Sequence, residues 1–384
     1  MHTLFLVSSM HGGGAERVAA TLANAWVARG DRVTLVCCYS GRGICLQPLD
    51  DRVKLLWLAD QLRGPALFRP ISKLLALRRL ARRLQPNRVL SFLTNVNVST
   101  LLASRGLQLP VVVSERTDPA YSVNLEPALR YLRRLSYPWA HQVVVQTAAA
   151  SGHLKQVAPR VRRIQVIPNP LPQGLPPARQ TEPAGPRFRL VALGRFNPVK
   201  QFDRLIAVFA TLAPQFPDWD LCIWGDGAQR QACQAQVDDL GLSGRVQLPG
   251  FSTTPWQDLL TAHVFVLSSR VEGFPNALLE AMALGLPCVA LDCPSGPAEL
   301  TQEGAVATLV PLDDDTALVA ALRLQMQASP AQRTASGQQA AASVRARYGL
   351  PAILQAWDAL WTPSAIPEGK HATPNTDHGN HNDT

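Results

Sequence analysis

The stretch VEGFPNALLEAMALGLPCVA, residues 271–290, joins a predicted helix to a predicted strand. Pro275 suits the first turn of a helix, so it fixes where the helical part begins. The apolar run Pro287–Leu291 at the other end of the stretch predicts a buried strand. A helix that leads directly into a buried strand is typical of an α/β sheet.

Short apolar runs of the same kind recur in both halves of the chain, separated by stretches with helical periodicity. These runs are Thr3–Ser8, Val33–Cys38, Val89–Phe92, Val111–Ser114, Val143–Gln146, Arg189–Gly194, Asp220–Gly225, Val264–Ser268 and Pro287–Leu291. The alternation predicts parallel sheets flanked by helices. A chain of 384 residues exceeds the size at which one core keeps growing, so we expect two domains.

We place the two domains at residues 1–170 and 188–345. Residues 171–187 between them are so rich in proline and glycine that they predict a linker without helix or central strand. Residues 346–362 predict a carboxyl-terminal helix that can pack back on the first domain, and the polar residues 363–384 predict a disordered tail. Two open α/β sheets joined this way direct the carboxyl ends of their strands into a shared cleft, where such folds bind ligands.

Composition excludes several classes of protein. Apolar residues make up 47% of the chain and charged residues 17%, and no stretch of about 18 uncharged apolar residues could span a bilayer. The amino terminus reads as a first strand rather than a signal peptide, which favours a cytoplasmic protein. The seven cysteines form no CxxC pair, so neither a disulfide framework nor a zinc site is expected.

The charge is unevenly divided between the halves. Residues 1–175 hold 23 Lys and Arg against 8 Asp and Glu, a balance of +15, whereas residues 176–384 hold 14 against 20, a balance of −6. A basic half implies an anionic partner. From charge alone this partner can be nucleic acid, a phospholipid surface or a phosphorylated acceptor.

Glu272 and Glu280 are the most informative acidic residues. Glu272 lies in the loop before the helix that Pro275 starts, and Glu280 lies two turns inside that helix. The first residues of the helix offer free backbone N–H groups and the positive end of the helix dipole, which suits a diphosphate. These N–H groups belong to Asn276, Ala277 and Leu278. A surface helix with two unrelated glutamates is the alternative.

At this motif the sequence resembles the retaining glycosyltransferases of family 4, whose GT-B fold has two facing Rossmann-like domains. The E-x7-E signature of that family stands here as EGFPNALLEAMA. The resemblance implies a UDP-sugar donor, with Glu272 at the sugar hydroxyls near the reacting carbon and Glu280 at the ribose. It also implies that Gly273 and Phe274 border the donor.

The stretch LGRFNPVKQFDRLI, residues 193–206, places Arg195 and Lys200 between a strand and a helix. A guanidinium and an ammonium at this spacing can converge on a diphosphate. In the family that the chain resembles, this pair neutralises the leaving nucleoside diphosphate, so neither a bound metal nor a cofactor is expected. An exposed basic turn is the alternative.

A glycine loop joins the first strand to the first helix in SSMHGGGAERVAATLANAW, residues 8–26. Gly13 and Gly14 let the backbone approach a ligand closely. The loop is not G-x-G-x-x-G, and no acidic residue closes a second strand, so a dehydrogenase is not expected. The resemblance places this loop near the donor phosphates and the acceptor; a structural tight turn is the alternative.

Two further stretches are predicted to border the donor. The turn LPGF resembles the part of the family that reads the nucleobase, which assigns Phe251 to the donor site; a core phenylalanine is the alternative. The stretch DCPSGPAEL, residues 292–300, is expected to pack beside the donor loop, with its glycine giving close approach.

The strand VVVSERTDPAY, residues 111–121, is expected to deliver Glu115 and Arg116 to the edge of the cleft. The SER motif is similar to that of transferases acting on lipid-linked oligosaccharides. By this resemblance Glu115 orients or deprotonates the acceptor hydroxyl, and Arg116 holds a phosphate or a sugar. An ion pair between Glu115 and a neighbouring residue is the alternative.

Residues 69–84, RPISKLLALRRLARRL, carry six basic residues and no acidic one. Helical spacing gives an apolar side beside a basic side, which suits an anionic membrane surface. The resemblance assigns such a helix to the diphosphate of a polyprenyl-linked acceptor. The residues so assigned are Lys73, Arg78, Arg79 and Arg82. A solvated helix whose apolar face packs on the core is the alternative.

Taken together, the motifs predict a metal-independent, retaining glycosyltransferase that moves a hexose or N-acetylhexosamine from a UDP-sugar to a glycan hydroxyl. The motifs most resemble those of bacterial transferases that build lipid-linked oligosaccharides, O-antigen or exopolysaccharide. We therefore expect a protein that is peripheral on the inner face of the cell membrane. The alternatives are an epimerase or a phosphorylase of the same fold, or a non-catalytic anion-binding protein. No nucleic-acid-binding motif is present, so nucleic acid is not expected as the partner.

Overall fold

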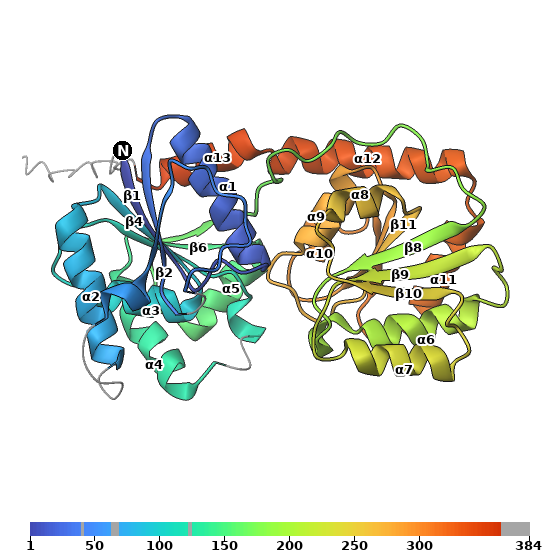
Figure 1. Ribbon diagram of the computed structural model, residues 1–384, viewed down its shortest axis with the longest axis horizontal. Coiled ribbons are helices and arrows are strands. Elements are labelled where there is room, and N and C mark those ends of the chain that lie inside the picture. Colours follow the sequence, from blue (N-terminus) through green and yellow to red (C-terminus); the bar gives the residue numbers. More distant parts are fainter. Residues whose placement is uncertain (40–41, 63–68, 122–124, 362–384) are drawn as a thin grey trace, which may run out of the picture.

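The computed structural model describes residues 1–39, 42–62, 69–121 and 125–361. Over these ranges the chain forms two α/β domains, each built on a parallel sheet with helices on both faces (Figure 1). The α/β fold with two facing Rossmann-like domains that the sequence predicts is thereby confirmed. The predicted tail at 363–384 lies outside the described residues.

The described part of the amino-terminal domain contains a seven-stranded sheet in the order β3-β2-β1-β4-β5-β6-β7, with every pairing parallel. Its strands are β1 (His2–Val7), β2 (Arg32–Cys37), β3 (Lys54–Trp57), β4 (Arg88–Phe92), β5 (Val111–Ser114), β6 (Gln142–Val145) and β7 (Ile164–Val166). β-branched and leucine side chains dominate these strands, because both faces of the sheet are covered.

Helices cover this sheet on its two faces. The described helical segments are α1 (Gly14–Ala28), η1 (Leu58–Gln61), α2 (Arg69–Leu84), α3 (Thr94–Ser104), η3 (Pro119–Tyr121), α4 (Pro127–Ser136), η4 (Tyr137–Trp139) and α5 (Ala148–Val157). α2, α3, η4 and α5 share one core with the sheet, and α1 packs on the opposite face.

The carboxyl-terminal domain repeats the plan with a six-stranded parallel sheet in the order β10-β9-β8-β11-β12-β13 across the described chain. Its strands are β8 (Phe188–Leu193), β9 (Trp219–Trp224), β10 (Val246–Gly250), β11 (Val264–Leu267), β12 (Cys288–Asp292) and β13 (Thr308–Pro311). Its helices are η5 (Pro198–Lys200), α6 (Phe202–Leu212), α7 (Arg230–Asp239), α8 (Pro255–Leu260), α9 (Asn276–Ala283), α10 (Pro297–Thr301), α11 (Asp315–Gln327) and α12 (Pro330–Tyr348).

The chain crosses between the domains twice. The segment between β7 and β8 contains no described helix or strand. At the other end, α12 leads into α13 (Leu350–Ala359), whose Ile353 and Trp357 join α1 in the core of the amino-terminal domain. The two crossings touch where the Leu171 N–H donates to the Tyr348 carbonyl at 2.8 Å. Figure 1 shows α12 and α13 along the top of both domains.

The strand order reverses between β1 and β4 in one sheet and between β8 and β11 in the other. Open α/β sheets bind ligands at such a switch point, outside the carboxyl ends of the strands. The glycine loop follows β1, the loop with Arg195 and Lys200 follows β8, and the loop with Glu272 follows β11. The fold therefore gathers the predicted donor residues at the two switch points.

Within the described ranges, no helix combines the length and the apolar character needed to cross a membrane.

Candidate active site at the interdomain seam

Lys200 and Glu272 meet at the switch point of the carboxyl-terminal sheet. Lys200 ends η5 just after β8, and Glu272 lies in the loop after β11, the neighbouring strand. The ammonium nitrogen lies 2.5 Å from Glu272 Oε1, and the side chains are 20% and 12% exposed. This ion pair stands at the seam, which we define as the boundary where the loops at the carboxyl ends of the two sheets contact each other.

The donor loop, residues 268–275, is fixed by the loop that follows β12. The Glu272 N–H donates to the Pro294 carbonyl at 2.8 Å, and the Ser295 N–H donates to the Glu272 carbonyl at 3.0 Å. Gly296 has a φ of +109°, and a Cβ there would lie 2.6 Å from Pro275 Cδ. The expected packing of residues 292–300 beside the donor loop, with a glycine at the close approach, is confirmed.

Arg195 follows β8 and is exposed. Among the described residues, no side chain forms a hydrogen bond or an ion pair with its guanidinium. Lys200, by contrast, is already paired with Glu272. The loop after β8 thus presents one compensated and one uncompensated cation five residues apart, which suits a ligand that carries more than one negative charge.

Helix α9 begins at Asn276, and Pro275 is its N-cap residue. The prediction that Asn276 offers a free N–H is wrong, because this group donates to the Phe274 carbonyl at 2.9 Å. The N–H groups of Ala277 and Leu278 find no acceptor in the described part of the chain. The helix start therefore offers two of the three predicted donors to an anion.

Glu280 is the fifth residue of α9, closer to the helix start than the sequence indicates, and its side chain is 2% exposed. Arg17 of α1 reaches it from the other domain, with guanidinium nitrogens 3.0 and 3.1 Å from the two carboxylate oxygens. The indole N–H of Trp256 donates to Glu280 Oε2 at 2.8 Å. The carboxylate assigned to the ribose thus joins the two domains.

The glycine loop faces the donor side of the seam. A Cβ on Gly14 would lie 2.7 Å from Asn276 Nδ2, and one on Gly13 would lie 2.2 Å from Glu16 Oε2. Phe251 is 65% exposed, and its ring lies 3.7 Å from where a Cβ on Gly12 would stand. Phe251 is therefore not a core residue, and the alternative interpretation of LPGF is wrong.

Gly273 touches the backbone of the opposite domain. A Cβ at this position would lie 2.4 Å from the Arg116 carbonyl oxygen and 2.8 Å from Thr117 Cα. Phe274, the next residue, is 6% exposed and packs in the core of the carboxyl-terminal domain. Gly273 thus borders the seam, whereas the Phe274 side chain anchors the donor loop in the core of the carboxyl-terminal domain.

Arg116 is 6% exposed, and its guanidinium lies 4.3 Å from the centre of the Phe92 ring. It donates to Asn169 Oδ1; burial alone lowers its pKa, because no carboxylate of the described residues compensates the charge. Asn169 in turn donates to Asn276 Oδ1 at 2.6 Å. A buried cation with only neutral partners is expensive, so this position favours an anion nearby.

Glu115 lies below the seam surface. It is 1% exposed and accepts hydrogen bonds from Thr94 Oγ1 at 2.8 Å and from the Tyr137 hydroxyl at 2.5 Å. Burial raises the pKa of its carboxyl, which Arg133 at 3.9 Å opposes. The structure shows the ion pair that the sequence left as an alternative; a contact with the acceptor stays a prediction.

Helix α2 lies at the outer edge of the amino-terminal domain, and the carboxyl-terminal domain lies on the other side (Figure 1). Leu77 and Leu80 are buried in the core, whereas Ile71 and Leu75 are exposed, so the apolar side packs on the domain only in part. Arg78 donates to the carbonyls of Ala103 and Arg105 at 2.9 and 2.6 Å. The predicted acceptor residues of α2 are not brought together with the donor residues.

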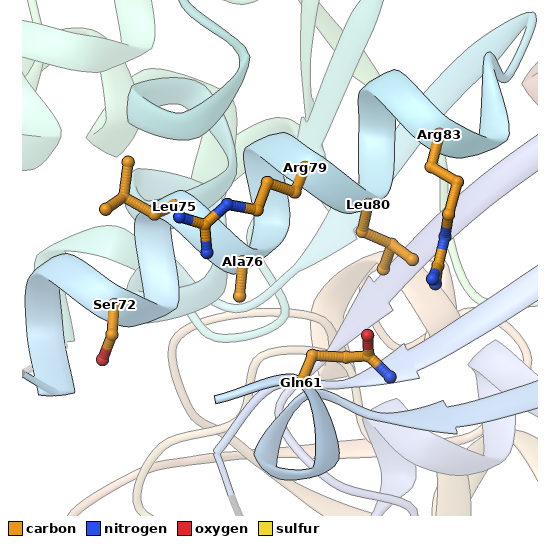
Figure 2. A pocket seen from close by; sticks show the side chains of 7 residues that line it. All are labelled: Gln61, Ser72, Leu75, Ala76, Arg79, Leu80 and Arg83. Carbon is orange, nitrogen blue, oxygen red and sulfur yellow. The ribbon is translucent and has the colours of Figure 1, made fainter. Parts of the chain in front are cut away.

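The other basic side chains of α2 remain accessible to different extents. Lys73 lies over the Tyr39 ring, 4.2 Å from its centre, and Arg79 and Arg82 are exposed. A groove of about 500 Å³ separates α2 from η1. Its lining, drawn in Figure 2, consists of Gln61, Ser72, Leu75, Ala76, Arg79, Leu80 and Arg83. The groove combines apolar walls with two guanidinium groups.

Sequence reasoning missed several polar residues at or near the seam. Arg17 and Trp256 bind Glu280, and Asn169 connects Arg116 with Asn276. His153 of α5 contacts the buried Asp118 carboxylate, with Nδ1 2.8 and 2.9 Å from its two oxygens. The GGAER pattern contains Arg17, but nothing local indicates a partner 263 residues away.

No group of three or more His, Cys, Asp or Glu within the described ranges is arranged to hold a metal ion.

Two facing parallel α/β domains with a donor loop and a basic pair at their seam define a glycosyltransferase of the GT-B type. Residues 12–172 match the family described as Glycosyltransferase Family 4, and residues 178–342 match Glycosyl transferases group 1. The chain belongs to the family 4 glycosyltransferases. This confirms the resemblance that the sequence motifs indicate.

Similar proteins cover nearly the whole chain. An α-1,4-N-acetyl-D-galactosaminyltransferase of Campylobacter jejuni, whose name specifies a PP-undecaprenol-linked glycan, is 27% identical over 84% of this chain and 88% of its own length. The amylovoran biosynthesis glycosyltransferase AmsD of Erwinia amylovora is 26% identical over 90% and 95%. The crystal structure of Anabaena HepE with UDP-glucose superposes with a TM-score of 0.78, at 20% identity, over 94% and 98%. That last likeness concerns the fold.

Proposed function

We propose that this glycosyltransferase moves a hexose or N-acetylhexosamine from a UDP-sugar to a glycan hydroxyl with retention of anomeric configuration. The observation that carries the proposal is the Lys200–Glu272 pair beside the uncompensated Arg195. A diphosphate and a sugar present the complementary groups, since phosphate oxygens bind cations and sugar hydroxyls donate to a carboxylate.

Each part of a UDP-sugar has a partner at the seam. The diphosphate lies between Arg195, Lys200 and the free N–H groups at the start of α9, and the sugar lies at Glu272. When the Lys200 ammonium moves from Glu272 to the phosphate, the Glu272 carboxylate becomes free to bind the sugar hydroxyls. Glu280 accepts from the ribose hydroxyls, and HepE, a protein of the same fold, was crystallised with UDP-glucose.

The residues at the seam supply electrostatic stabilisation rather than a nucleophile. As the bond between the anomeric carbon and the phosphate breaks, negative charge grows on the leaving UDP, and the two cations stabilise it. The acceptor hydroxyl attacks from the same face and its proton passes to the departing phosphate oxygen, so the configuration is retained. Arg195 and Lys200 replace a metal ion in this scheme.

The proposed acceptor is a glycan linked to a polyprenyl diphosphate, in the assembly of a bacterial surface polysaccharide. The name of the Campylobacter relative specifies an undecaprenol-linked acceptor. Exposed Arg79 and Arg82 on α2 and the net charge of +15 over residues 1–175 favour such an anion. The enzyme then works on the cytoplasmic side, peripheral to the inner face of the cell membrane.

The test is transfer from a panel of UDP-sugars to a lipid extract of bacterial membranes, followed by mass spectrometry of the products. A lipid product heavier by one hexose or N-acetylhexosamine residue supports the proposal. Conversion of the UDP-sugar into an isomer without transfer would indicate an epimerase instead, and release of a sugar phosphate by inorganic phosphate would indicate a phosphorylase. NMR of the anomeric proton in donor and product checks retention.

A further inference from the structure

Helix α4 turns its apolar side chains toward solvent. Tyr131 is 64% exposed, Leu132 36% and Leu135 40%, and Trp139 in the following η4 is 41% exposed. Tyr131 and Leu135 are four residues apart and therefore lie on one side of α4, Leu132 lies next to Tyr131, and Trp139 follows in η4. We call these four residues the α4 surface.

The face of α4 that packs on the domain is only partly apolar, because Leu129 contacts the core beside two buried polar residues. Arg133 and Ser136 are 3% and 1% exposed, and the Arg133 guanidinium lies 3.9 Å from the Glu115 carboxylate. A helix on a globular core ordinarily turns its apolar stripe inward, because burial of that stripe drives folding. α4 partly buries Leu129 but leaves Tyr131, Leu132 and Leu135 exposed, so the described fold leaves this second apolar group for another partner.

The charge around this stripe is mainly positive. Residues 127–139 contain three arginines, of which Arg133 is buried, and no acidic residue; the exposed Glu126 directly precedes the helix. Arg134 is exposed in the last turn of α4, and the Arg105 guanidinium lies 4.5 Å from the centre of the Trp139 ring. Tyrosine and tryptophan are the side chains that prefer the boundary between apolar and polar layers of a bilayer, and arginine binds phosphate.

Helix α2 extends the same side of the domain. Both α2 and α4 pack against α3, and Figure 1 shows the three helices along the lower left of the amino-terminal domain. Ile71 and Leu75 of α2 are 60% and 45% exposed. Basic and apolar side chains thus alternate over more than one helix, as expected of a surface that meets headgroups.

We infer that the α4 surface lies against an anionic lipid bilayer, with Tyr131, Leu135 and Trp139 among the headgroups and the arginines on lipid phosphates. The excess of arginine around the α4 surface favours this partner over a second copy of the chain, because two such positively charged surfaces would repel each other. The inference deepens the proposed function, since a polyprenyl-linked acceptor resides in a membrane, but the contact itself requires neither donor nor acceptor.

Vesicle flotation tests the inference with the full chain. The protein is mixed with vesicles of phosphatidylcholine alone or of phosphatidylcholine with phosphatidylglycerol, without any nucleotide. We expect binding to the anionic vesicles and about tenfold weaker binding by the Tyr131→Ser/Leu135→Ser double variant. Leu324→Ser is the matched control, because Leu324 is a 68% exposed leucine on α11 of the other domain; its binding should equal that of the wild type.

A second pair of substitutions, Arg105→Gln with Arg134→Gln, should abolish the difference in binding between the two kinds of vesicle and the sensitivity of binding to salt.

Equal binding by the wild type and the serine variant would overturn the inference. So would sedimentation that reveals a dimer which only the α4 variants dissociate, since the partner would then be a second copy. Titration with UDP in the absence of vesicles checks that each variant keeps its donor site; a chain that binds vesicles but no UDP contradicts the proposed function alone.

Discussion

The two domains bring their charged residues to the seam in different states. In the carboxyl-terminal domain, Arg195 is exposed and the Lys200–Glu272 pair keeps 20% and 12% of its side chains exposed. In the amino-terminal domain, Glu115 and Arg116 are 1% and 6% exposed. A ligand can therefore reach the first set directly, whereas the second set lies beneath the surface of the seam. Substitutions in the first set should affect turnover with little change in stability, whereas substitution of Arg116 should change both.

Removal of a donor-side cation should have the greatest consequence. Arg195→Ala and Lys200→Ala are each expected to lower kcat/KM for the UDP-sugar on the order of 10²–10³-fold, because charge on the leaving diphosphate loses its partner. The melting temperature should change little. Steady-state transfer assays and calorimetry measure the two effects.

Arg189→Ala is the matched control for these variants, since Arg189 lies near the start of β8, whose other end leads to Arg195. Near-normal transfer by both Arg195→Ala and Lys200→Ala would contradict the assignment of the leaving-group role.

A methyl group added at Gly273, where the two domains meet, should have the second-largest effect on the rate of transfer. Gly273→Ala places a Cβ 2.4 Å from the Arg116 carbonyl oxygen, so the donor loop must retreat from the opposite domain. Misplacement by about 1 Å costs on the order of 10²-fold in rate, and we expect a loss of that size in kcat.

Gly152→Ala serves as the comparison for that variant, because a Cβ on Gly152 of α5 would meet nothing within 4 Å. If Gly273→Ala transfers sugar at the normal rate, the closed arrangement of the two domains is not the reactive one.

The buried cation of the amino-terminal domain should behave in the opposite way. Without added substrate, Arg116→Met is expected to stabilise the protein by about 1–2 kcal/mol, because an uncompensated buried charge is replaced by an apolar side chain. Asn169 Oδ1 keeps a donor, since Gln146 Nε2 lies 2.7 Å away. Thermal unfolding measures the gain, and transfer should fall at the same time; a lower melting temperature would show that Arg116 is structural.

Chelation should have the smallest effect. With EDTA in excess the transfer rate is expected to stay within the error of the assay, because Arg195 and Lys200 provide the positive charge in the proposed scheme. Addition of Mg²⁺ or Mn²⁺ after dialysis should leave the rate unchanged. A metal-dependent recovery would assign leaving-group stabilisation to an ion instead.

The sequence predicts the inner strands of both sheets and misses the outer ones. All nine apolar runs correspond to β1, β2, β4, β5, β6, β8, β9, β11 and β12, whereas β3, β7, β10 and β13 are the four edges of the two described sheets. An edge strand has a neighbour on one side only, so it needs less apolar side chain. The burial of β7, half-buried at Ile164 and exposed at Gln165 and Val166, illustrates this.

The predicted donor residues can likewise be found from the sequence, because one short stretch contains both Glu272 and Glu280 with the helix start between them. The partners of these glutamates cannot be predicted from the sequence. Arg17 reaches Glu280 across 263 residues of chain, and the Arg116–Asn169–Asn276 connection also spans both domains. Such contacts depend on how two separately folded units dock, which no local pattern encodes.

Because the chain crosses between the domains twice, cleavage of one crossing does not separate the two domains. Ile353 and Trp357 of α13 are part of the core formed by α1 and the first sheet, although the helix follows the last residue of the second domain. A protease that cleaves the linker between β7 and β8 would yield two fragments that remain one particle. Release would require α13 to melt out of its partner, so limited digestion should produce a nicked enzyme that elutes at the size of the intact chain.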